Sequence, residues 1–190
     1  MADMRSHISD CALRLFHEHG YDAVSMRRLA KEADCTVMTL YRYFDRKIDI
    51  LTALWAEVFA TLFDELDAIA ASETNANLRL NKIAFGYVDF WLSHREHYFL
   101  VFMSSGISQS DVSIFVDDDG VVERFDIFRQ TIESVLGTRA TKAETALKSQ
   151  LLLCALNGIA HNLITISAYD WASPKDLVDA AVSGALQATA

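Results

Sequence analysis

Residues 25–47 read SMRRLAKEADCTVMTLYRYFDRK. Ser25 and Thr36 each precede a short run in which apolar residues recur at helical spacing, and both are residue types that cap helix N-termini. The pair Asp34-Cys35 separates the two runs, and Asp adopts left-handed turn conformations more readily than most residues. The pattern predicts two short helices joined by a turn of about three to four residues.

The second predicted helix, residues 37–44, has an inner and an outer side. Leu40 and Phe44 provide apolar contacts on the inner side, and the small Ala30 lets the two helices approach closely. The outer side presents Val37, Met38, Thr39, Arg42 and Tyr43. Apolar tips, a hydroxyl and a guanidinium suit thymine methyl groups, base edges and phosphates. We therefore predict a helix-turn-helix that places this helix in the major groove of DNA.

The distribution of charge agrees with this prediction, although the net charge of the chain is −9. Residues 1–50 hold eight Lys or Arg and eight Asp or Glu, whereas residues 51–190 carry the entire excess of acid. Residues 25–47 hold three acidic groups and six basic ones: Arg27, Arg28, Lys31, Arg42, Arg46 and Lys47. A locally basic face can contact phosphates, because salt screens charges beyond about 10 Å.

The rest of the chain predicts an all-α fold. It has a single proline, Pro174, and 52% of the residues of the whole chain are hydrophobic. Few helix breakers and recurrent helical stripes predict about nine helices. The predicted ranges are 8–19, 25–33, 37–44, 45–69, 78–93, 96–104, 121–136, 143–167 and 174–188, with a loop over 105–120. We expect a DNA-binding domain at 1–47 and a ligand-binding and dimerisation domain at 48–190.

Other candidate motifs are weaker. His94 and His97 are three residues apart, a spacing that could bind a metal ion, but a polar turn is the preferred interpretation. The run at residues 117–120 lacks the alternating acids of a calcium loop, and we interpret it as an exposed loop. The main enzyme signatures are missing, so we expect no enzymatic activity, no metal and no cofactor.

Residues 6–52 resemble the N-terminal domain of the tetracycline-repressor-like (TetR) family. The resemblance lies in residues 25–33 and 36–47, and in the preceding ALRLFHEHGY at 12–21. Two positions depart from the family pattern. Asp34 stands where the turn usually has glycine, which adds a negative charge near DNA, and Met38 replaces the usual small residue.

The resemblance implies a role for each matching residue. Arg27 matches a position that reaches a base or a phosphate, and residues 37–39 match the groove-facing start of the recognition helix. Tyr41, Tyr43 and Lys47 match positions that bind phosphates. The complete predicted DNA-binding set is Ser25, Arg27, Arg28, Thr36, Val37, Met38, Thr39, Tyr41, Arg42, Tyr43 and Lys47.

The family resemblance also implies a homodimeric transcriptional regulator, a repressor that a small effector releases from a palindromic DNA operator. Two half-sites require two DNA-binding domains related by a two-fold axis. We expect a bacterial cytoplasmic protein, associated with the nucleoid when bound to its operator, and no membrane partner. Two alternatives stay open: a regulator that binds DNA without a ligand, and a helical ligand-binding protein that merely retains a DNA-binding-like N-terminus.

Two further sets of residues are predicted in the C-terminal part. Dimerisation through the last two helices would use Leu151, Ala155, Gly158, Asn162 and Thr165. The effector would bind among aromatic side chains with few polar anchors, at Trp55, Phe59, Tyr87, Asp89, Trp91, Phe102 and Phe128. Because fixed cations are few there, we expect a neutral or cationic, largely apolar effector.

Overall fold

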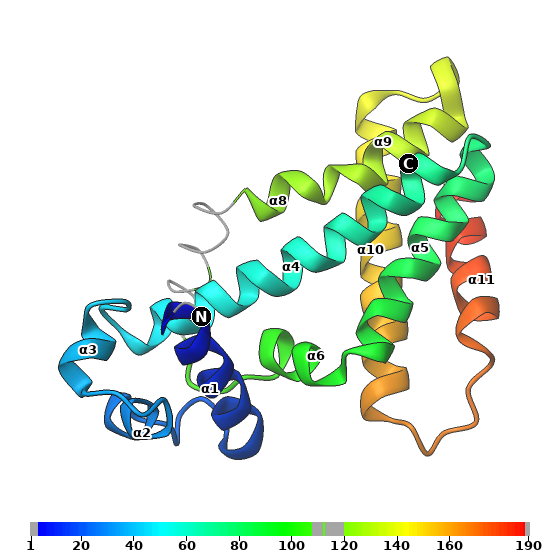
Figure 1. Cartoon of the computed structure of the whole chain (residues 1–190). Helices are drawn as coiled ribbons and strands as arrows, with labels where there is room; N and C mark the ends of the chain where they lie inside the picture. Colours follow the sequence, from blue (N-terminus) through cyan, green and yellow to red (C-terminus); the bar gives the residue numbers. More distant parts are fainter. Residues whose placement is uncertain (1–3, 108–111, 113–119, 189–190) are drawn as a thin grey trace. The chain divides into compact units, whose positions relative to one another are not determined.

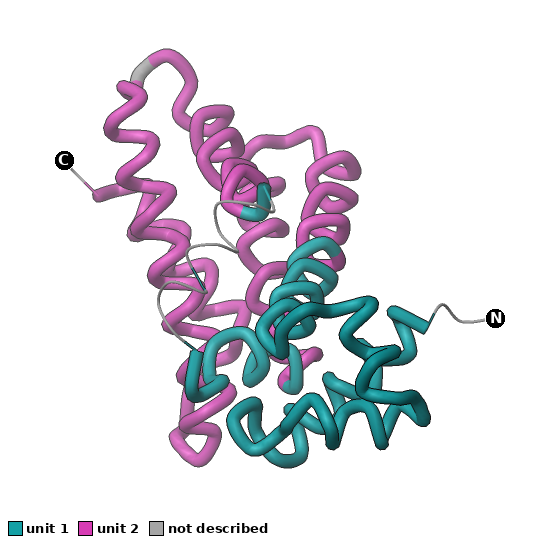
Figure 2. The backbone as a smooth tube through the Cα atoms, turned by 90° about the vertical axis from the view of Figure 1, so that its left-hand side faces the viewer, with its two compact units in different colours: residues 1–60, 96–121 teal, residues 61–95, 122–190 magenta. Residues whose placement is uncertain are grey.

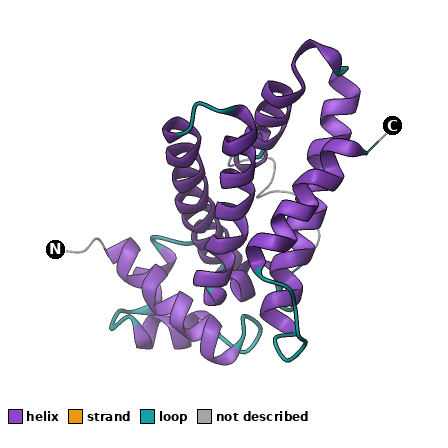
Figure 3. Ribbon diagram, turned by 90° about the vertical axis from the view of Figure 1, so that its right-hand side faces the viewer, coloured by secondary structure: helices purple, strands orange, loops and turns teal. Residues whose placement is uncertain are grey.

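A computed structural model of the protein describes residues 4–107, 112 and 120–188. Within these residues all regular structure is helical, as Figure 3 shows, so the predicted all-α class is confirmed. The acidic run at 117–119, predicted to be an exposed loop, lies outside the described residues. None of the described helices has an apolar segment long enough to span a membrane.

The chain divides into two compact units, coloured separately in Figure 2. The first comprises Met1–Ala60 and Glu96–Val121, and the second comprises Thr61–Arg95 and Val122–Ala190. Helix α4 (Lys47–Ser72) therefore contributes to both units. The assignment of DNA binding to residues 1–47, and of ligand binding and dimerisation to residues 48–190, stays a prediction.

The first unit contains α1 (Met4–His19), α2 (Met26–Glu32), α3 (Val37–Tyr41), the beginning of α4 and most of α6 (Arg95–Phe102), labelled in Figure 1. Its core includes the buried residues Ile8, Ala12, Leu15, Phe16, Leu29, Ala30, Leu40 and Phe44. The helical stripe predicted on α1 is therefore its buried side. Gly20 follows α1 with a φ of +80°, a conformation that ends a helix and favours glycine.

The second unit contains α5 (Ala76–Ser93), α8 (Val121–Arg124), α9 (Asp126–Leu136), the 3₁₀ turn Gly137–Arg139, α10 (Lys142–Thr165) and α11 (Pro174–Gln187), together with the end of α4. Helices α5, α9 and α10 pack against one another, and α11 packs against α5 and α10. Side-chain oxygens of Asn75, Thr141 and Ser173 cap three of these helices. Pro174 occupies the first turn of α11, as predicted.

The predicted helix 121–136 is interrupted in the structure, which separates α8 from α9 at Phe125. Backbone hydrogen bonds from Phe125 to Val122 and from Phe128 to Phe125 close three-residue turns there. The Phe125 ring packs edge to face on Phe63, with centroids 4.8 Å apart. No proline or glycine lies at this break, so the sequence alone did not reveal it.

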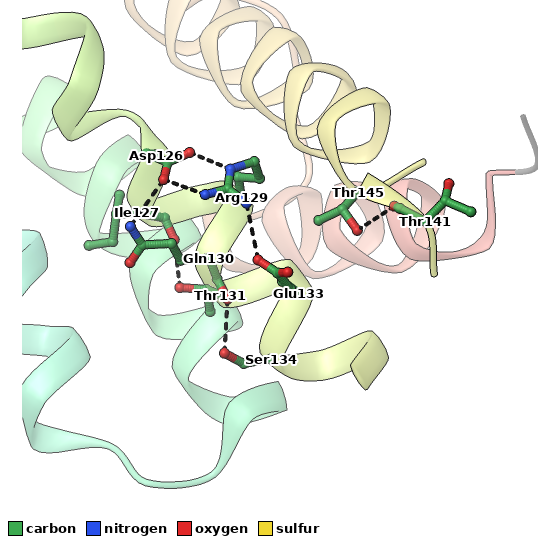
Figure 4. Close-up of polar contacts among 9 residues, drawn as sticks. All are labelled: Asp126, Ile127, Arg129, Gln130, Thr131, Glu133, Ser134, Thr141 and Thr145. Carbon is green, nitrogen blue, oxygen red and sulfur yellow. Dashed lines mark hydrogen bonds and ion pairs between the residues drawn. The ribbon is translucent and has the colours of Figure 1, made fainter. Parts of the chain in front are cut away.

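Helix α9 displays a network of polar side chains, drawn in Figure 4. The Arg129 guanidinium donates to Asp126 (2.6 Å) on one side and to Glu133 (3.0 Å) on the other. The hydroxyls of Thr131 and Ser134 donate to backbone carbonyls one turn earlier. These charges and hydroxyls are therefore satisfied within a single helix.

Candidate DNA-binding surface

Helix α3 begins with a cap that the sequence predicted. The Thr36 hydroxyl accepts a hydrogen bond from the Thr39 amide at 3.0 Å and lies 2.8 Å from the Thr39 hydroxyl. Leu40 and Phe44 are buried, so the inner side of the helix is held against the core. The outer side is consequently held in one orientation by both packing and capping.

The turn before α3 also follows the prediction. Asp34 has a φ of +48°, and the Cys35 amide donates to the Ala30 carbonyl at 2.9 Å. Asp tolerates the left-handed region better than most residues, which explains how it replaces glycine here. The Ser25 hydroxyl caps α2 by accepting from the Arg28 amide at 3.3 Å. An ion pair of 2.5 Å between Arg14 and Glu32 joins α1 to α2.

The outer side of α3 is apolar at its tip. Met38 is 78% exposed and Tyr41 is 48% exposed, whereas Val37, Thr39 and Tyr43 are half-buried. A methionine this exposed gains nothing from the core of its own chain. Such a side chain suits an apolar contact with a base edge in the groove.

The cations around α3 are available to a partner. Arg27, Arg28, Lys31 and Arg42 are exposed, and within the part of the chain that the structure describes no ion pair or side-chain hydrogen bond engages their charged groups. An exposed cation without a carboxylate neighbour can pair with a phosphate without first breaking another contact.

Lys47 is placed differently from these four. Its ammonium donates to the Tyr21 carbonyl at 2.7 Å and lies 3.9 Å from the centre of the Tyr21 ring. Burial lowers the pKa of this ammonium, and the nearby Asp22 charge opposes that shift. Lys47 thus ties the start of α4 to Tyr21, in the loop after α1. An ammonium has three donors, so its predicted phosphate contact stays possible beside this bond.

One contact at this surface was missed from the sequence. Arg5 donates to the Tyr43 carbonyl at 3.1 Å, and its guanidinium lies 4.4 Å above the Phe44 ring. Arg5, at the beginning of α1, therefore supports the segment that follows α3. No local pattern could reveal this pair, because 38 residues separate the two partners.

The seven predicted effector residues fall in different places. Tyr87, Trp91 and Phe128 are fully buried in the second unit, where Tyr87 packs edge to face on the other two rings. The Tyr87 hydroxyl donates to the Asn157 side chain at 2.7 Å. Asp89 is exposed at a groove that also includes Phe85.

The other three predicted effector residues belong to the first unit. Trp55 and Phe59 are buried, and the Trp55 indole donates to the Leu100 carbonyl at 3.2 Å. Phe102 is 43% exposed at the end of α6. The aromatic set predicted as one pocket is thus divided between the two units, and its role in binding stays a prediction.

The predicted dimerisation residues lie on α10. Ala155, Gly158 and Asn162 line a hollow of about 260 Å³, whose other lining residues are Ile159, Leu163, Trp171 and Leu177. Leu151 and Thr165 are exposed on the same helix. A Cβ added at Gly158 would meet nothing within 4 Å, so this position is open in the single chain.

His94 and His97 do not form part of a metal-binding cluster of described residues. His94 ends α5, and its Nδ1 lies 2.9 Å from the Phe90 carbonyl oxygen. The interpretation of His94 as part of a polar turn therefore agrees with its position.

Comparison with known proteins places residues 8–54 in the family described as bacterial regulatory proteins, tetR family. This segment of the chain is similar to the TetR family. The match covers α1 to α3 and the start of α4, the same segment that carries the capped turn and the unpaired cations. The resemblance predicted from residues 6–52 is confirmed.

A curated protein with a similar segment is the HTH-type transcriptional repressor KstR of Mycolicibacterium smegmatis. It is 35% identical over 79 residues, which are 42% of this chain and 39% of that protein. The chain thus spans about two fifths of the length of this curated relative.

Two solved TetR-like structures share the fold of nearly the whole chain. The fatty acid degradation regulator FadR of Bacillus halodurans has a TM-score of 0.78 at 18% identity, covering 98% of this chain and 96% of its own. FadR of Bacillus subtilis, solved in complex with stearoyl-CoA, has a TM-score of 0.78 at 15% identity. The match covers 96% of this chain and 97% of the FadR chain. At this identity the likeness shows the fold alone.

Proposed function

We propose that this protein is a DNA-binding transcriptional repressor that uses α3 as its recognition helix. The observation that carries the proposal is the set of unpaired cations, Arg27, Arg28, Lys31 and Arg42, around the exposed tip of α3. Phosphate contacts by these groups would fix the position of the protein on DNA, and Met38 with its neighbours would read bases. The match to the TetR family and the name of KstR as a repressor support the same function.

The experiment is a mobility shift with the DNA that flanks the gene of this protein. We expect a discrete complex that unlabelled specific DNA competes away and random DNA does not. Arg42→Ala should weaken the complex about fivefold or more, the range for loss of a base or phosphate contact. Arg95→Ala is the matched control, because Arg95 is also exposed and has no ion-pair partner among the described residues. No complex, or equal losses for both variants, would refute the proposal.

The same proposal includes a homodimer formed through α10 and α11. The support is the hollow around Gly158, lined almost entirely by apolar atoms, beside the exposed Leu151 and Tyr169. Two helices from each subunit would form a four-helix bundle across the two-fold axis. The dimer would present two copies of α3 to a palindromic operator.

Gly158→Leu tests this interface, because a larger side chain there has room in the single chain. We expect its melting temperature to stay within about 2 °C of wild type, while an overpacked seam weakens dimerisation by about tenfold or more. Sedimentation at several protein concentrations measures the dimer. A wild-type protein that is monomeric at micromolar concentration would rule out the interface.

We also propose that a small, largely apolar effector releases the protein from DNA. An effector that binds one conformation better than the DNA-bound one shifts the population away from DNA. The stearoyl-CoA in the Bacillus subtilis FadR structure has an apolar acyl chain, which supports an apolar binding region in a protein of this fold. Addition of the effector to the mobility shift should dissolve the complex.

A further inference from the structure

A groove lies on the second unit where the end of α4, the face of α5 and the beginning of α11 meet. Its volume is about 510 Å³, within the range of roughly 300–1,000 Å³ that small-ligand sites occupy. Its apolar lining is provided by Ile69, Leu78, Phe85 and Gly86. Leu78 and Phe85 are 53% and 36% exposed, so the groove offers apolar surface that the chain itself does not cover.

Gly86 lies at a close contact between α5 and α4 beside this groove. A Cβ added there would lie 2.7 Å from the Ile69 Cδ1 atom, which is closer than two carbon atoms approach. The missing side chain lets α4 and α5 come together behind the exposed Phe85 ring. The groove is therefore built by the packing of the two helices.

The neutral donors in the groove are partly used by the helices that carry them. The Ser72 hydroxyl donates to the Ile69 carbonyl at 2.8 Å, and the Asn81 amide donates to the Asn77 carbonyl at 3.0 Å. Both bonds return to the helix that carries the donor. Asn81 keeps one amide hydrogen for a ligand, whereas the Ser72 hydroxyl would have to break its bond in order to donate.

The two lysines of the groove are also paired. The Lys82 ammonium lies 2.8 Å from a Glu73 carboxylate oxygen, and the Lys175 ammonium lies 2.5 Å from Asp179. Each positive charge is thus matched by a carboxylate. An anionic ligand would have to share each ammonium with the carboxylate beside it, and that carboxylate would repel the ligand.

Asp89 is the charged group that remains. It is exposed, lines the groove one helical turn after Phe85, and has no ion-pair or hydrogen-bond partner among the described residues. A carboxylate can only accept hydrogen bonds, so its partner must be a donor or a cation. An aromatic face beside it attracts the same kind of group.

We infer that this groove binds a compact organic ammonium ion, with its apolar body on Leu78 and Phe85 and its cationic nitrogen at Asp89. The inference rests on the proposed function only where it identifies this ammonium ion with the effector that releases the protein from DNA. Binding itself does not require DNA and can be measured without it.

The groove stays open in the proposed dimer. Lys175 and Asp179, four residues apart, share one face of α11. Leu177, which lines the hollow at Gly158, lies about 160–200° around the helix from both of them, because each residue advances about 100°. One face of α11 can therefore enter the dimer bundle while the other borders the groove.

Three probes with one ring system separate the possible ligand charges: 1-naphthylmethylammonium, 1-naphthylmethanol and 1-naphthylacetate. Titration calorimetry on the full chain measures their affinities, and amide chemical shifts locate the site. We expect the ammonium to bind at least about fivefold tighter than the alcohol, with the acetate weakest. One charge pair at about 4 Å in water contributes roughly this factor. Amide shifts should change for residues 78–89.

Asp89→Asn should lower the affinity for the ammonium about fivefold and leave that for the alcohol unchanged. Asp170→Asn is the matched control, because it removes the same charge from an exposed residue of the second unit outside this groove. Phe85→Ala should weaken all three probes, since it removes a shared apolar contact. These side chains are exposed enough for the variants to fold, which thermal melting checks.

Tighter binding of the acetate, or equal effects of Asp89→Asn and Asp170→Asn, would overturn the inference. Shifts confined to residues outside the groove would overturn it as well. The mobility shift without any probe is run on the same preparations. A normal DNA complex with no ammonium binding refutes the groove alone, whereas ammonium binding at Asp89 with no DNA complex refutes the proposed function alone.

Discussion

Two charged surfaces of this protein, one on α2 and α3 and one on α9, use arginine in opposite ways. On α9, Arg129 is held by Asp126 and Glu133 within the same helix (Figure 4). Around α3, Arg27 and Arg42 are exposed and no described carboxylate engages them. The residue type is the same, and the surroundings differ.

The difference shows which cations can serve a partner. An exposed ion pair contributes little to stability, about 0–1 kcal/mol, but it occupies donors of the cation and acceptor oxygens of the carboxylate. A guanidinium without such a neighbour keeps its donors for a phosphate or a base. The availability of each cation therefore distinguishes the two surfaces better than the local charge count does.

The largest effect should come from removing two of the available cations together. The double variant Arg27→Ala/Arg28→Ala should reduce the slope of log affinity against log salt by about two units, because each phosphate contact contributes about 0.9. The affinity should fall roughly thirtyfold near 0.15 M salt. Fluorescence anisotropy across a salt series measures both quantities.

Arg129→Ala is the control for this comparison, because it removes the same charge from a paired site. We expect its salt slope to equal that of wild type. A slope that falls equally in Arg129→Ala, or that stays unchanged in the double variant, would show that the contrast between the surfaces does not govern DNA binding.

Lys47→Met sharpens the comparison with a cation that is partly engaged. The variant keeps the apolar stem but loses the bond to the Tyr21 carbonyl and the contact with its ring. We expect the free energy of unfolding to fall by about 1 kcal/mol and the salt slope to fall by about one unit. Denaturant unfolding and salt-dependent anisotropy give the two values. Loss of stability with an unchanged slope would assign Lys47 a structural role only.

The smallest effect concerns the paired surface and its response to pH. The hydrogen bond from Arg129 holds the pKa of Asp126 below its usual value. A carboxyl whose pKa is lowered by folding stabilises the folded protein at pH values above its pKa in the unfolded chain, which is about 3.9. This stabilisation is lost as the pH falls through the pKa of the same carboxyl in the folded protein. Asp126→Asn should therefore melt on the order of one degree lower at pH 7 and lose less stability than wild type between pH 4 and pH 2. Thermal melts at each pH test this, and parallel curves for both proteins would contradict it.

The prediction of the two capped helices and the turn between them succeeded because its determinants are local. Ser25 and Thr36 cap the helices that immediately follow them, and Asp34 sets the turn at its own φ of +48°. Each of these interactions spans about three residues, so the order of residue types is sufficient to reveal it.

The prediction of the effector site was weaker because its determinants are not local. The predicted effector set contains aromatic side chains that the fold then distributes: Tyr87 and Trp91 enter the core of the second unit, and Phe102 belongs to the first. An aromatic residue in a core helix and one beside a ligand have the same local pattern.

The sequence by itself determined the helical class, the capped turn and the family resemblance of the N-terminal segment, since periodicity, caps and motif residues act over one or two helical turns. Only the tertiary structure decided which charges are free. Arg124 pairs with Asp64 and Asp67 from about sixty residues away, and Lys82 meets Glu73 across the cap of α5. Asp89 has no such partner among the described residues. These pairings follow from which helix faces meet, and that depends on the packing of the entire core rather than on any short stretch of residues.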